Sequence, residues 1–160
     1  MSSFRIGFGS DLHRLDVDLP LVIGGITIPH HKGCVGHSDG DALIHAICDA
    51  LLGAANLRDI GFHFPDTSDD NKDMESKFFL IKVMELIRNE AYELGNIDCT
   101  LNLQEPKLKN YIPLMKSFIA DVMQVEESQI SVKAKTGEHV GPVGRQEAIS
   151  VECVALISKK

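Results

Sequence analysis

The stretch SDGDALIHAICDALLGAA, residues 38–55, is where the sequence changes from strand-like to helix-like spacing. Its apolar side chains recur every three or four residues, which predicts an amphipathic helix: Ile44, Ile47, Cys48, Leu51 and Leu52. Ser38 is followed three residues later by Asp41, a pattern that resembles a capping box with Asp in place of Glu or Gln. We therefore expect the helix to begin at Ser38.

The residues before this helix read as strands. Phe4 to Gly9 is a short apolar run that predicts one strand. Leu19 to Ile23 and Ile26 to Pro29 predict a hairpin that turns at Gly24-Gly25.

The residues after the helix alternate between helix and strand patterns. A second helix is expected from Glu75 to Leu94, with Gly95 as its C′ stop. A half-buried strand follows, then a third helix opened by Pro113, then two further strands: Asn96–Gln104, 113–124, Ile130–Lys135 and Ala148–Ser158. This order predicts an α+β fold, a mixed β-sheet with helices packed on one face.

Size and charge limit the function classes. At 160 residues and 17.6 kDa, with 44% hydrophobic residues, the chain is expected to form one domain over residues 1–160. A formal net charge of −7 argues against a nucleic-acid-binding or anionic-membrane surface, but allows a small basic pocket. No segment approaches the roughly 18 apolar residues that span a bilayer, and the N-terminus lacks a signal-peptide pattern. We expect a cytoplasmic protein whose four widely spaced cysteines are reduced.

A possible metal site begins with Asp11 and His13. In an extended chain their side chains point to the same face and could hold one ion, although Asp11 could equally cap a turn and His13 lie on the surface. His45 lies at the edge of the apolar helix face, where a histidine is more often a hydrogen-bonded core residue than a ligand. Together, two imidazoles and one carboxylate form the donor set of an open catalytic zinc site. Sequence alone does not show whether they converge.

The polar segment from Leu57 to Met74 contains Gly61, Pro65 and five aspartates. A connection of this length is usually functional or mobile, so we interpret it as a candidate lid. No convincing Ser-His-Asp or Cys-His arrangement is present in the sequence, so a side-chain nucleophile is not expected.

Several motifs, taken together in order and spacing, resemble a known family over almost the whole chain: GSDLHRL (9–15), VIGGITIP (22–29), GHSDGDALIHAICDALLGAANLRDIGFHFPDT (36–67), QEPKL (104–108), VKAKTGEHVGPVGRQE (132–147) and ISVECVALISK (149–159). The chain is similar to the 2-C-methyl-D-erythritol 2,4-cyclodiphosphate synthases of the non-mevalonate isoprenoid pathway. The resemblance implies an intramolecular phosphoryl transfer on 4-diphosphocytidyl-2-C-methyl-D-erythritol 2-phosphate, with release of CMP.

The resemblance also implies residue roles. Asp11, His13 and His45 would bind Zn²⁺ or another divalent ion, and Glu138 would bind Mg²⁺ or Mn²⁺ together with the diphosphate. Catalytic roles would fall to His37, Asp59 and Thr136. Further substrate contacts would come from the metal-side motifs and from the late loops: Ser38, Gly61, Phe64, Asp66, Pro106, Lys107, Leu108, Ala134, Lys135 and Arg145. Ser38 could instead only cap the helix, and Lys107 could be a solvated charge.

The resemblance further implies a homotrimer, with three sheets around a threefold axis and active sites between subunits. Arg145 and Glu147 would then lie near a central cavity. The residues alone leave two alternatives open. A phosphohydrolase could use the same three ligands to activate water, and a non-catalytic module could use a zinc ion to stabilise the fold, although structural zinc normally has four protein ligands.

Overall fold

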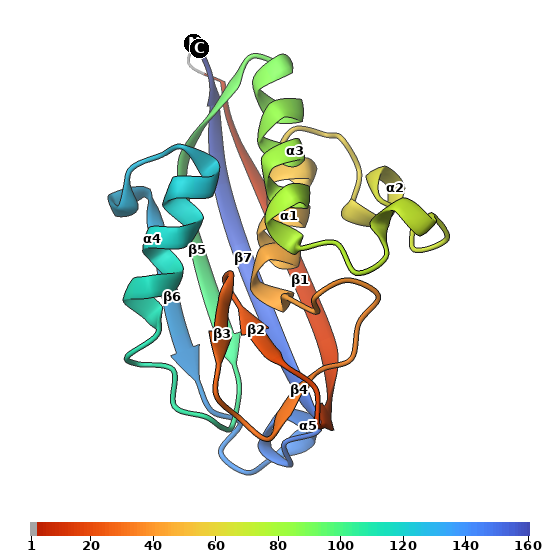
Figure 1. Ribbon diagram of the computed structural model, residues 1–160. Coiled ribbons are helices and arrows are strands. Elements are labelled where there is room, and N and C mark those ends of the chain that lie inside the picture. Colours follow the sequence, from red (N-terminus) through yellow and green to blue (C-terminus); the bar gives the residue numbers. More distant parts are fainter. Residues whose placement is uncertain (1–2) are drawn as a thin grey trace.

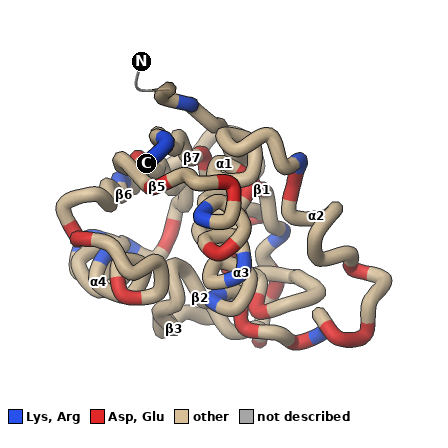
Figure 2. Tube along the Cα trace, turned by 90° about the horizontal axis from the view of Figure 1, so that it is seen from above, with Lys and Arg blue, Asp and Glu red and all other residues tan. Residues whose placement is uncertain are grey.

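A computed structural model describes residues 3–160 and contains one five-stranded sheet in the order β4-β1-β7-β5-β6 (Figure 1). Its strands are β1 (Phe4–Val17), β4 (Lys32–Cys34), β5 (Tyr92–Asn102), β6 (Ile130–Lys135) and β7 (Ala148–Lys159). β5 and β6 run parallel, whereas the other neighbours are antiparallel. The long helices α1 (Ala42–Ala54), α3 (Ser76–Asn89) and α4 (Ile112–Met123) lie on one side of this sheet, as Figure 2 shows from above. The predicted α+β class with a mixed sheet is confirmed.

Helix α1 packs directly against β1 because two glycines leave room for its backbone. A Cβ atom built at Gly9 would lie only 2.6 Å from the backbone nitrogen of Ala50, and closer still to the carbonyl oxygen of Ala46. A Cβ atom at Gly7 would meet the helix backbone in the same way. This close approach places the first turns of α1 beside the middle of β1.

The predicted start of α1 at Ser38 is wrong, because Asp41 is the N-cap. Its side chain accepts a hydrogen bond from the N–H of Ile44 at 3.1 Å. The same carboxylate accepts from the N–H groups of Gly24 and Gly25 at 2.9 and 2.7 Å. These glycines form the turn of the predicted hairpin, which the structure confirms as β2 (Leu21–Ile23) and β3 (Ile26–Ile28). The carboxylate of Asp41 therefore joins the hairpin to α1.

Strand β1 is longer than predicted. It does not end at Gly9 but pairs with β7 as far as Arg14 and with β4 from Leu15 to Val17. Asp11 and His13 therefore lie inside a strand, opposite Val151 and Ile149. Hydrogen bonds to two neighbouring strands hold this polar part of the chain in an extended conformation. The local apolar pattern does not predict this extension, because it ends at Gly9.

The boundary between α3 and β5 also differs from the prediction. The helix ends before Leu94, Ala91 adopts a positive φ of 61°, and β5 begins at Tyr92. Gly95 is not a helix stop but lies in β5, at a register shift between Leu94 and Asn96. Antiparallel pairing with β7 pulls these residues into the sheet, so the tertiary structure overrides the local helix pattern.

The later elements agree more closely with the predictions. α4 starts beside Pro113 and ends at Met123, with Gln124 as its C-cap in the left-handed conformation, and β6 has the predicted bounds. The candidate lid contains α2 (Ile60–His63) and a 3₁₀ turn, η1 (Asp69–Asn71). A short helix α5 (Gly141–Gly144) and a 3₁₀ turn η2 (Glu127–Gln129) were not expected. Among residues 3–160, no helix is long and apolar enough to cross a membrane.

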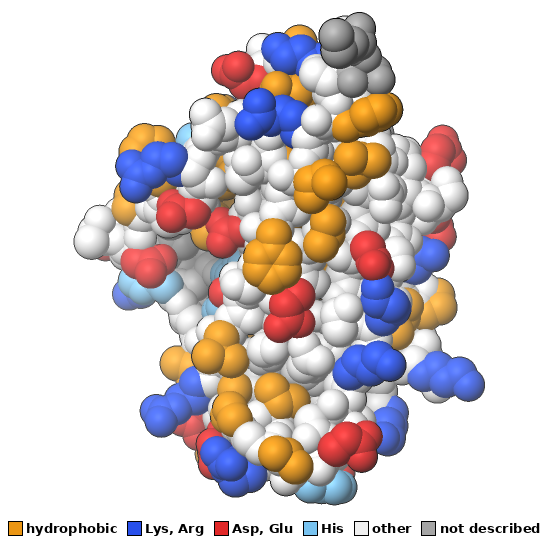
Figure 3. Space-filling view, turned by 180° about the vertical axis from the view of Figure 1, so that it is seen from behind, with side chains coloured by type: hydrophobic (Ala, Val, Ile, Leu, Met, Phe, Trp, Pro, Cys, Tyr) orange, Lys and Arg blue, Asp and Glu red, His pale blue; other side chains and the backbone are white. Residues whose placement is uncertain are grey.

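The face of the sheet opposite the helices carries exposed apolar side chains, seen from behind in Figure 3. They come from alternate positions of β1 and from β7: Phe4, Ile6, Phe8, Leu12 and Val154. Along β7, the positions that face the helices are buried, and those on the opposite face are only partly covered. We call these five side chains the apolar sheet face.

Candidate metal centre and substrate site

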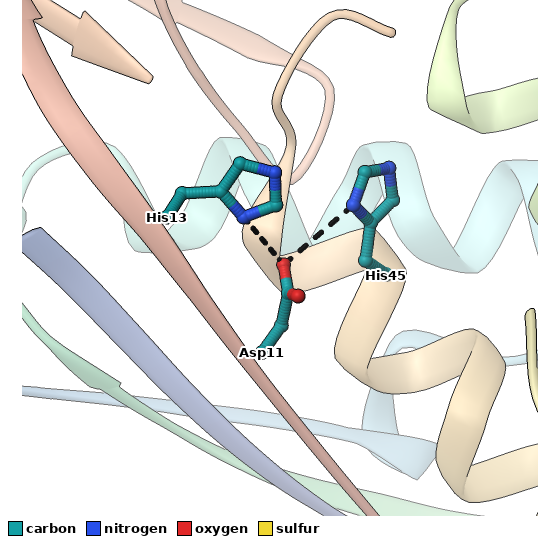
Figure 4. Close-up of side chains that lie close together, drawn as sticks. All are labelled: Asp11, His13 and His45. Carbon is teal, nitrogen blue, oxygen red and sulfur yellow. Dashed lines mark ion pairs between the residues drawn. The ribbon is translucent and has the colours of Figure 1, made fainter. Parts of the chain in front are cut away.

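Asp11, His13 and His45 converge where α1 crosses β1 (Figure 4). Asp11 and His13 project from the same face of β1, and His45 reaches them from the first turn of α1. The Oδ2 atom of Asp11 lies 2.7 Å from Nδ1 of His13 and 3.6 Å from Nδ1 of His45. One donor atom from each residue lies within 4.8 Å of the other two, so the three residues could hold one metal ion.

The burial of this cluster fits a metal ion. Asp11 Oδ2 and His13 Nδ1 are buried and have no hydrogen-bond partner within the described part of the chain, although they lie close together. Buried polar atoms without partners are costly, and a divalent cation bound by both would satisfy them. Two imidazole nitrogens and a carboxylate oxygen also leave a coordination position open, as catalytic zinc sites do.

The cluster shifts the pKa values of its own members. Burial would raise the pKa of Asp11, but the two neighbouring imidazoles outweigh it and lower that pKa to about 2. Burial would lower the pKa of His45, yet the adjacent Asp11 carboxylate raises it above 6.5. In the metal-free protein these shifts favour a charged pair, with Asp11 ionised and His45 protonated more readily than an exposed histidine.

The far side of the His45 ring contacts a group of polar residues. His45 Nε2 lies 2.9 Å from Ser76 Oγ and 3.3 Å from Ser38 Oγ. Ser76 is fully buried in the first turn of α3, and both its hydroxyl and its backbone N–H donate to the carboxylate of Asp39. Neither Ser76 nor Asp39 was predicted from sequence as a site residue, although Asp39 is part of the GHSDGD motif.

A cavity of about 350 Å³ opens beside the three potential ligands. It includes eight of the residues predicted from sequence: Asp11, His13, His37, Ser38, His45, Gly61, Phe64 and Asp66. Arg14, Ile60, Asn71 and Phe79 also line it and were not predicted. We call this space the metal-side cavity. The Leu57–Met74 segment forms part of its wall.

A second cavity of about 310 Å³ lies by β6 and the start of α4. It gathers the predicted late-motif residues Pro106, Lys107, Leu108, Ala134, Lys135 and Thr136, and it adds Leu103, Lys109 and Ile112. We call it the β6-side cavity. Its lining is apolar with lysine side chains, a composition that suits a flat base joined to an anionic group.

Three predicted residues line neither cavity. Asp59 caps α2 by accepting from the N–H of Phe62 at 2.9 Å. Glu138 is exposed and accepts a hydrogen bond from the Thr136 hydroxyl at 3.1 Å, next to the β6-side cavity. Arg145 forms an exposed ion pair with Glu147 at 3.0 Å. Glu147 itself lines a different cavity, together with Arg14, Lys32 and Pro142.

Within one chain the two cavities share no lining residue. Asp11 and His13 lie on β1, and the β6-side cavity lies beyond β7 and β5. Three strand spacings, roughly 14 Å, therefore separate β1 from β6. The fold does not bring the two sets of predicted residues together in a single chain.

Two further residues, also missed from sequence, position the loops around the cavities. Asp49 of α1 accepts a hydrogen bond from the N–H of Ile60 at 2.7 Å and so ties α2 to the helix that carries His45. Gln104 is buried and accepts from the N–H groups of Gly137 and His139, which orders the loop that carries Thr136 and Glu138. Gln104 and Asp49 lie in quoted motifs, but nothing in their local patterns indicates these long-range contacts.

Comparison with known proteins agrees with this architecture. A curated protein from Porphyromonas gingivalis named 2-C-methyl-D-erythritol 2,4-cyclodiphosphate synthase is 56% identical over 154 residues, which cover 96% of this chain and 95% of that protein. A solved CDP complex of IspF from Plasmodium falciparum is 36% identical, with a TM-score of 0.88 and coverage of 100% of this chain and 99% of that one. The bifunctional IspDF of Campylobacter jejuni has a TM-score of 0.96 at 37% identity, and the similarity covers 100% of this chain and 43% of the bifunctional protein.

The family comparison covers the same region as the structural match. The family model described as the YgbB family matches residues 4–158, from the first residue of β1 almost to the end of β7. With this match and with relatives above 50% identity over nearly the full length, the chain belongs to the YgbB family.

Proposed function

We propose that the chain, acting as one synthase domain over residues 1–160, is a metal-dependent 2-C-methyl-D-erythritol 2,4-cyclodiphosphate synthase of isoprenoid-precursor synthesis. It would convert 4-diphosphocytidyl-2-C-methyl-D-erythritol 2-phosphate into the cyclic diphosphate and CMP. The observation that carries the proposal is the cluster of Asp11, His13 and His45 on the wall of a cavity. The names of relatives at 56% identity support the choice of product.

Asp11, His13 and His45 would hold Zn²⁺ or a similar divalent ion, and Glu138 would hold Mg²⁺ or Mn²⁺ with the diphosphate. When bound, these ions would supply electrostatic stabilisation of the charge that develops on the phosphoryl oxygens. Glu138 is exposed at the edge of the β6-side cavity, next to Thr136. Its carboxylate is therefore placed to meet a cation that arrives with the substrate.

The chain's own residues would act mainly by positioning the substrate. His37 and Ser38 would donate to the 2-phosphate, and Asp66 would accept from the methylerythritol hydroxyls, with Gly61 and Phe64 shaping the same wall. Asp59 lies just outside that wall at the start of α2, and we assign it a catalytic role in orienting the substrate there. Holding both ends of one molecule lowers the entropic cost of ring closure. No side-chain nucleophile is required, because the 2-phosphate attacks the β-phosphate.

The nucleotide end would occupy the β6-side cavity. Pro106 and Leu108 offer apolar walls for the base, whereas Lys107 and Lys135 offer positive charge near the diphosphate. Ala134 would contact the nucleotide through its backbone, and the Thr136 hydroxyl would donate to a phosphate oxygen as the reaction proceeds. A solved CDP complex among the relatives supports a cytidine nucleotide as the bound class.

We further propose that the enzyme is a homotrimer with each active site between two subunits. Two observations support it: the cavities are separate within one chain, and the apolar sheet face is exposed, with Ile6 at 73% and Leu12 at 65%. Packing three such faces around a threefold axis would bury them and would bring one chain's metal-side cavity toward its neighbour's β6-side cavity. Arg145 and Glu147 would then lie toward the threefold axis rather than in the catalytic pocket.

The deciding experiment for the reaction uses the cytidine substrate, the purified protein and Zn²⁺ plus Mg²⁺, followed by phosphorus NMR. The expected products are CMP and a cyclic diphosphate. A linear phosphate product would show hydrolysis instead and would refute the synthase assignment. Asp66→Asn serves as a variant in the same cavity whose substrate affinity, rather than metal content, should fall.

The shared site is tested by complementation. His45→Ala and Glu138→Ala variants should each be inactive alone, because each removes one half of every site. After refolding together, some interfaces combine an intact metal side with an intact nucleotide side, so part of the activity should return. Each variant refolded alone is the control. An active monomer in sedimentation, or verified mixed oligomers without activity, would contradict the shared site.

A further inference from the structure

We propose that Ser76 and Asp39 are positioning residues that orient the His45 ring and fix its tautomer, so that its Nδ1 lone pair faces the metal centre. This inference rests on the proposed metal-dependent function, and it concerns residues that neither touch the substrate nor bind the metal. It is drawn from the hydrogen bonds on the far side of the His45 ring, where α1, α3 and the segment before α1 meet.

The direction of these hydrogen bonds can be worked out from Asp39. Its Oδ2 atom accepts from the backbone N–H of Ser76 at 2.8 Å, and its Oδ1 atom accepts from the N–H of Asp41 at 3.1 Å. Both oxygens therefore face donors, as an ionised carboxylate requires. The Ser76 hydroxyl also contacts Oδ1, and because the carboxylate has no proton to give, the hydroxyl must donate.

A serine hydroxyl has one proton, and that of Ser76 is used on Asp39. Toward His45 Nε2, at 2.9 Å, Ser76 Oγ can therefore only accept. In the neutral imidazole the proton then belongs on Nε2, and Nδ1 carries a lone pair. His45 Nδ1 lies 3.6 Å from Oδ2 of Asp11, so the lone pair is available to a cation bound there.

The rigidity of this arrangement comes from burial. Ser76 is fully buried, and its hydroxyl and backbone N–H both donate to Asp39. Asp39 thereby accepts a hydrogen bond from the first turn of α3, where the N-cap residue Glu75 makes no side-chain capping bond. Ser38 Oγ, at 3.3 Å from Nε2, is a longer contact on the same nitrogen. Residues that orient a metal-binding histidine in this way typically change metal affinity 10- to 100-fold when removed.

Ser76→Ala is the informative variant, because it deletes the hydroxyl and keeps the backbone N–H that donates to Asp39. Zn²⁺ affinity, measured by competition with a chelator, should fall by about 10-fold or more. Ser117→Ala, at a half-buried serine within α4, is the matched control and should bind Zn²⁺ as the parent does. A folded Ser76→Ala protein with parental Zn²⁺ affinity would overturn the proposal.

A second measurement needs no variant. In the metal-free parent protein, above the pH at which an NMR titration shows that His45 has lost its charge, ¹⁵N NMR of the imidazole should place the remaining proton on Nε2. Ser76→Ala should let the proton distribute between the two ring nitrogens. A proton on Nδ1 in the parent would refute the proposed role of Ser76 and Asp39, even if the protein binds Zn²⁺. A parent that binds no Zn²⁺ but keeps the proton on Nε2 would instead refute the metal-dependent function alone.

Discussion

Gly9→Ala is expected to disable the metal centre without touching any of its ligands. The backbone at Gly9 needs no special conformation, so the effect comes from the added Cβ atom alone. That atom would lie 2.6 Å from the backbone nitrogen of Ala50, whereas ordinary contact begins at 3.4 Å. The helix must therefore move away from β1 by at least about 0.8 Å, since the opposing atom belongs to the backbone and cannot rotate away.

The displacement matters because His45 is carried by α1, whereas Asp11 and His13 are carried by β1. Metal-ligand distances are tolerated within about 0.2 Å, which is smaller than the expected shift. We expect Zn²⁺ affinity and activity to fall at least 10-fold, together with a loss of about 1–3 kcal/mol in the free energy of unfolding from overpacking.

The assay compares Zn²⁺ competition, activity and urea unfolding in Gly9→Ala and in Gly53→Ala. Gly53 lies in α1, and a Cβ atom there would meet only the carbonyl oxygen of Phe8, at 4.0 Å. This control should keep its metal affinity and gain about 0.5–1 kcal/mol of stability, as a helix glycine replaced by alanine does. A folded Gly9→Ala protein with parental Zn²⁺ affinity would refute the idea that the glycine contact sets the ligand geometry.

Three further outcomes are expected. Asp41→Ala removes a fully buried carboxylate that accepts three backbone hydrogen bonds, so the free energy of unfolding in urea should fall by about 3 kcal/mol. A fall below about 1 kcal/mol would contradict the role of Asp41 in joining the β2–β3 hairpin to α1. Asp11→Asn should lower the pKa of His45 in an NMR titration of the metal-free protein, and an unchanged pKa would contradict the Asp11–His45 interaction. Because the pKa of His45 is raised in the folded protein, this pair stabilises the fold below pH 6.5, and the stabilisation is lost as pH rises through the raised pKa. Deuterium uptake over residues 57–74 should slow when CMP and the cyclic diphosphate are added, and unchanged uptake at saturation would remove the lid role.

Local patterns in the sequence determined much of the fold. Periodic apolar residues located α1, Pro113 located the start of α4, the Gly24-Gly25 turn located the β2–β3 hairpin, and strand-like segments located β6 and β7. These signals are short-range, because each is carried by residues that lie within a few positions of one another in the sequence. The donor types at Asp11, His13 and His45 also follow from the sequence, since two imidazoles and a carboxylate suit a divalent ion.

Where local patterns conflict or give no signal, only the tertiary structure decided the outcome. Pairing with β7 extended β1 through Asp11 and His13 and drew Tyr92 to Leu94 out of the predicted helix. Convergence of His45 with β1 depends on the glycine contact between α1 and that strand, and the separation of the two cavities depends on strand order. The hydrogen bonds from His45 through Ser76 to Asp39 join positions up to 37 residues apart. No local pattern encodes such contacts, because they form only when three separate segments pack together.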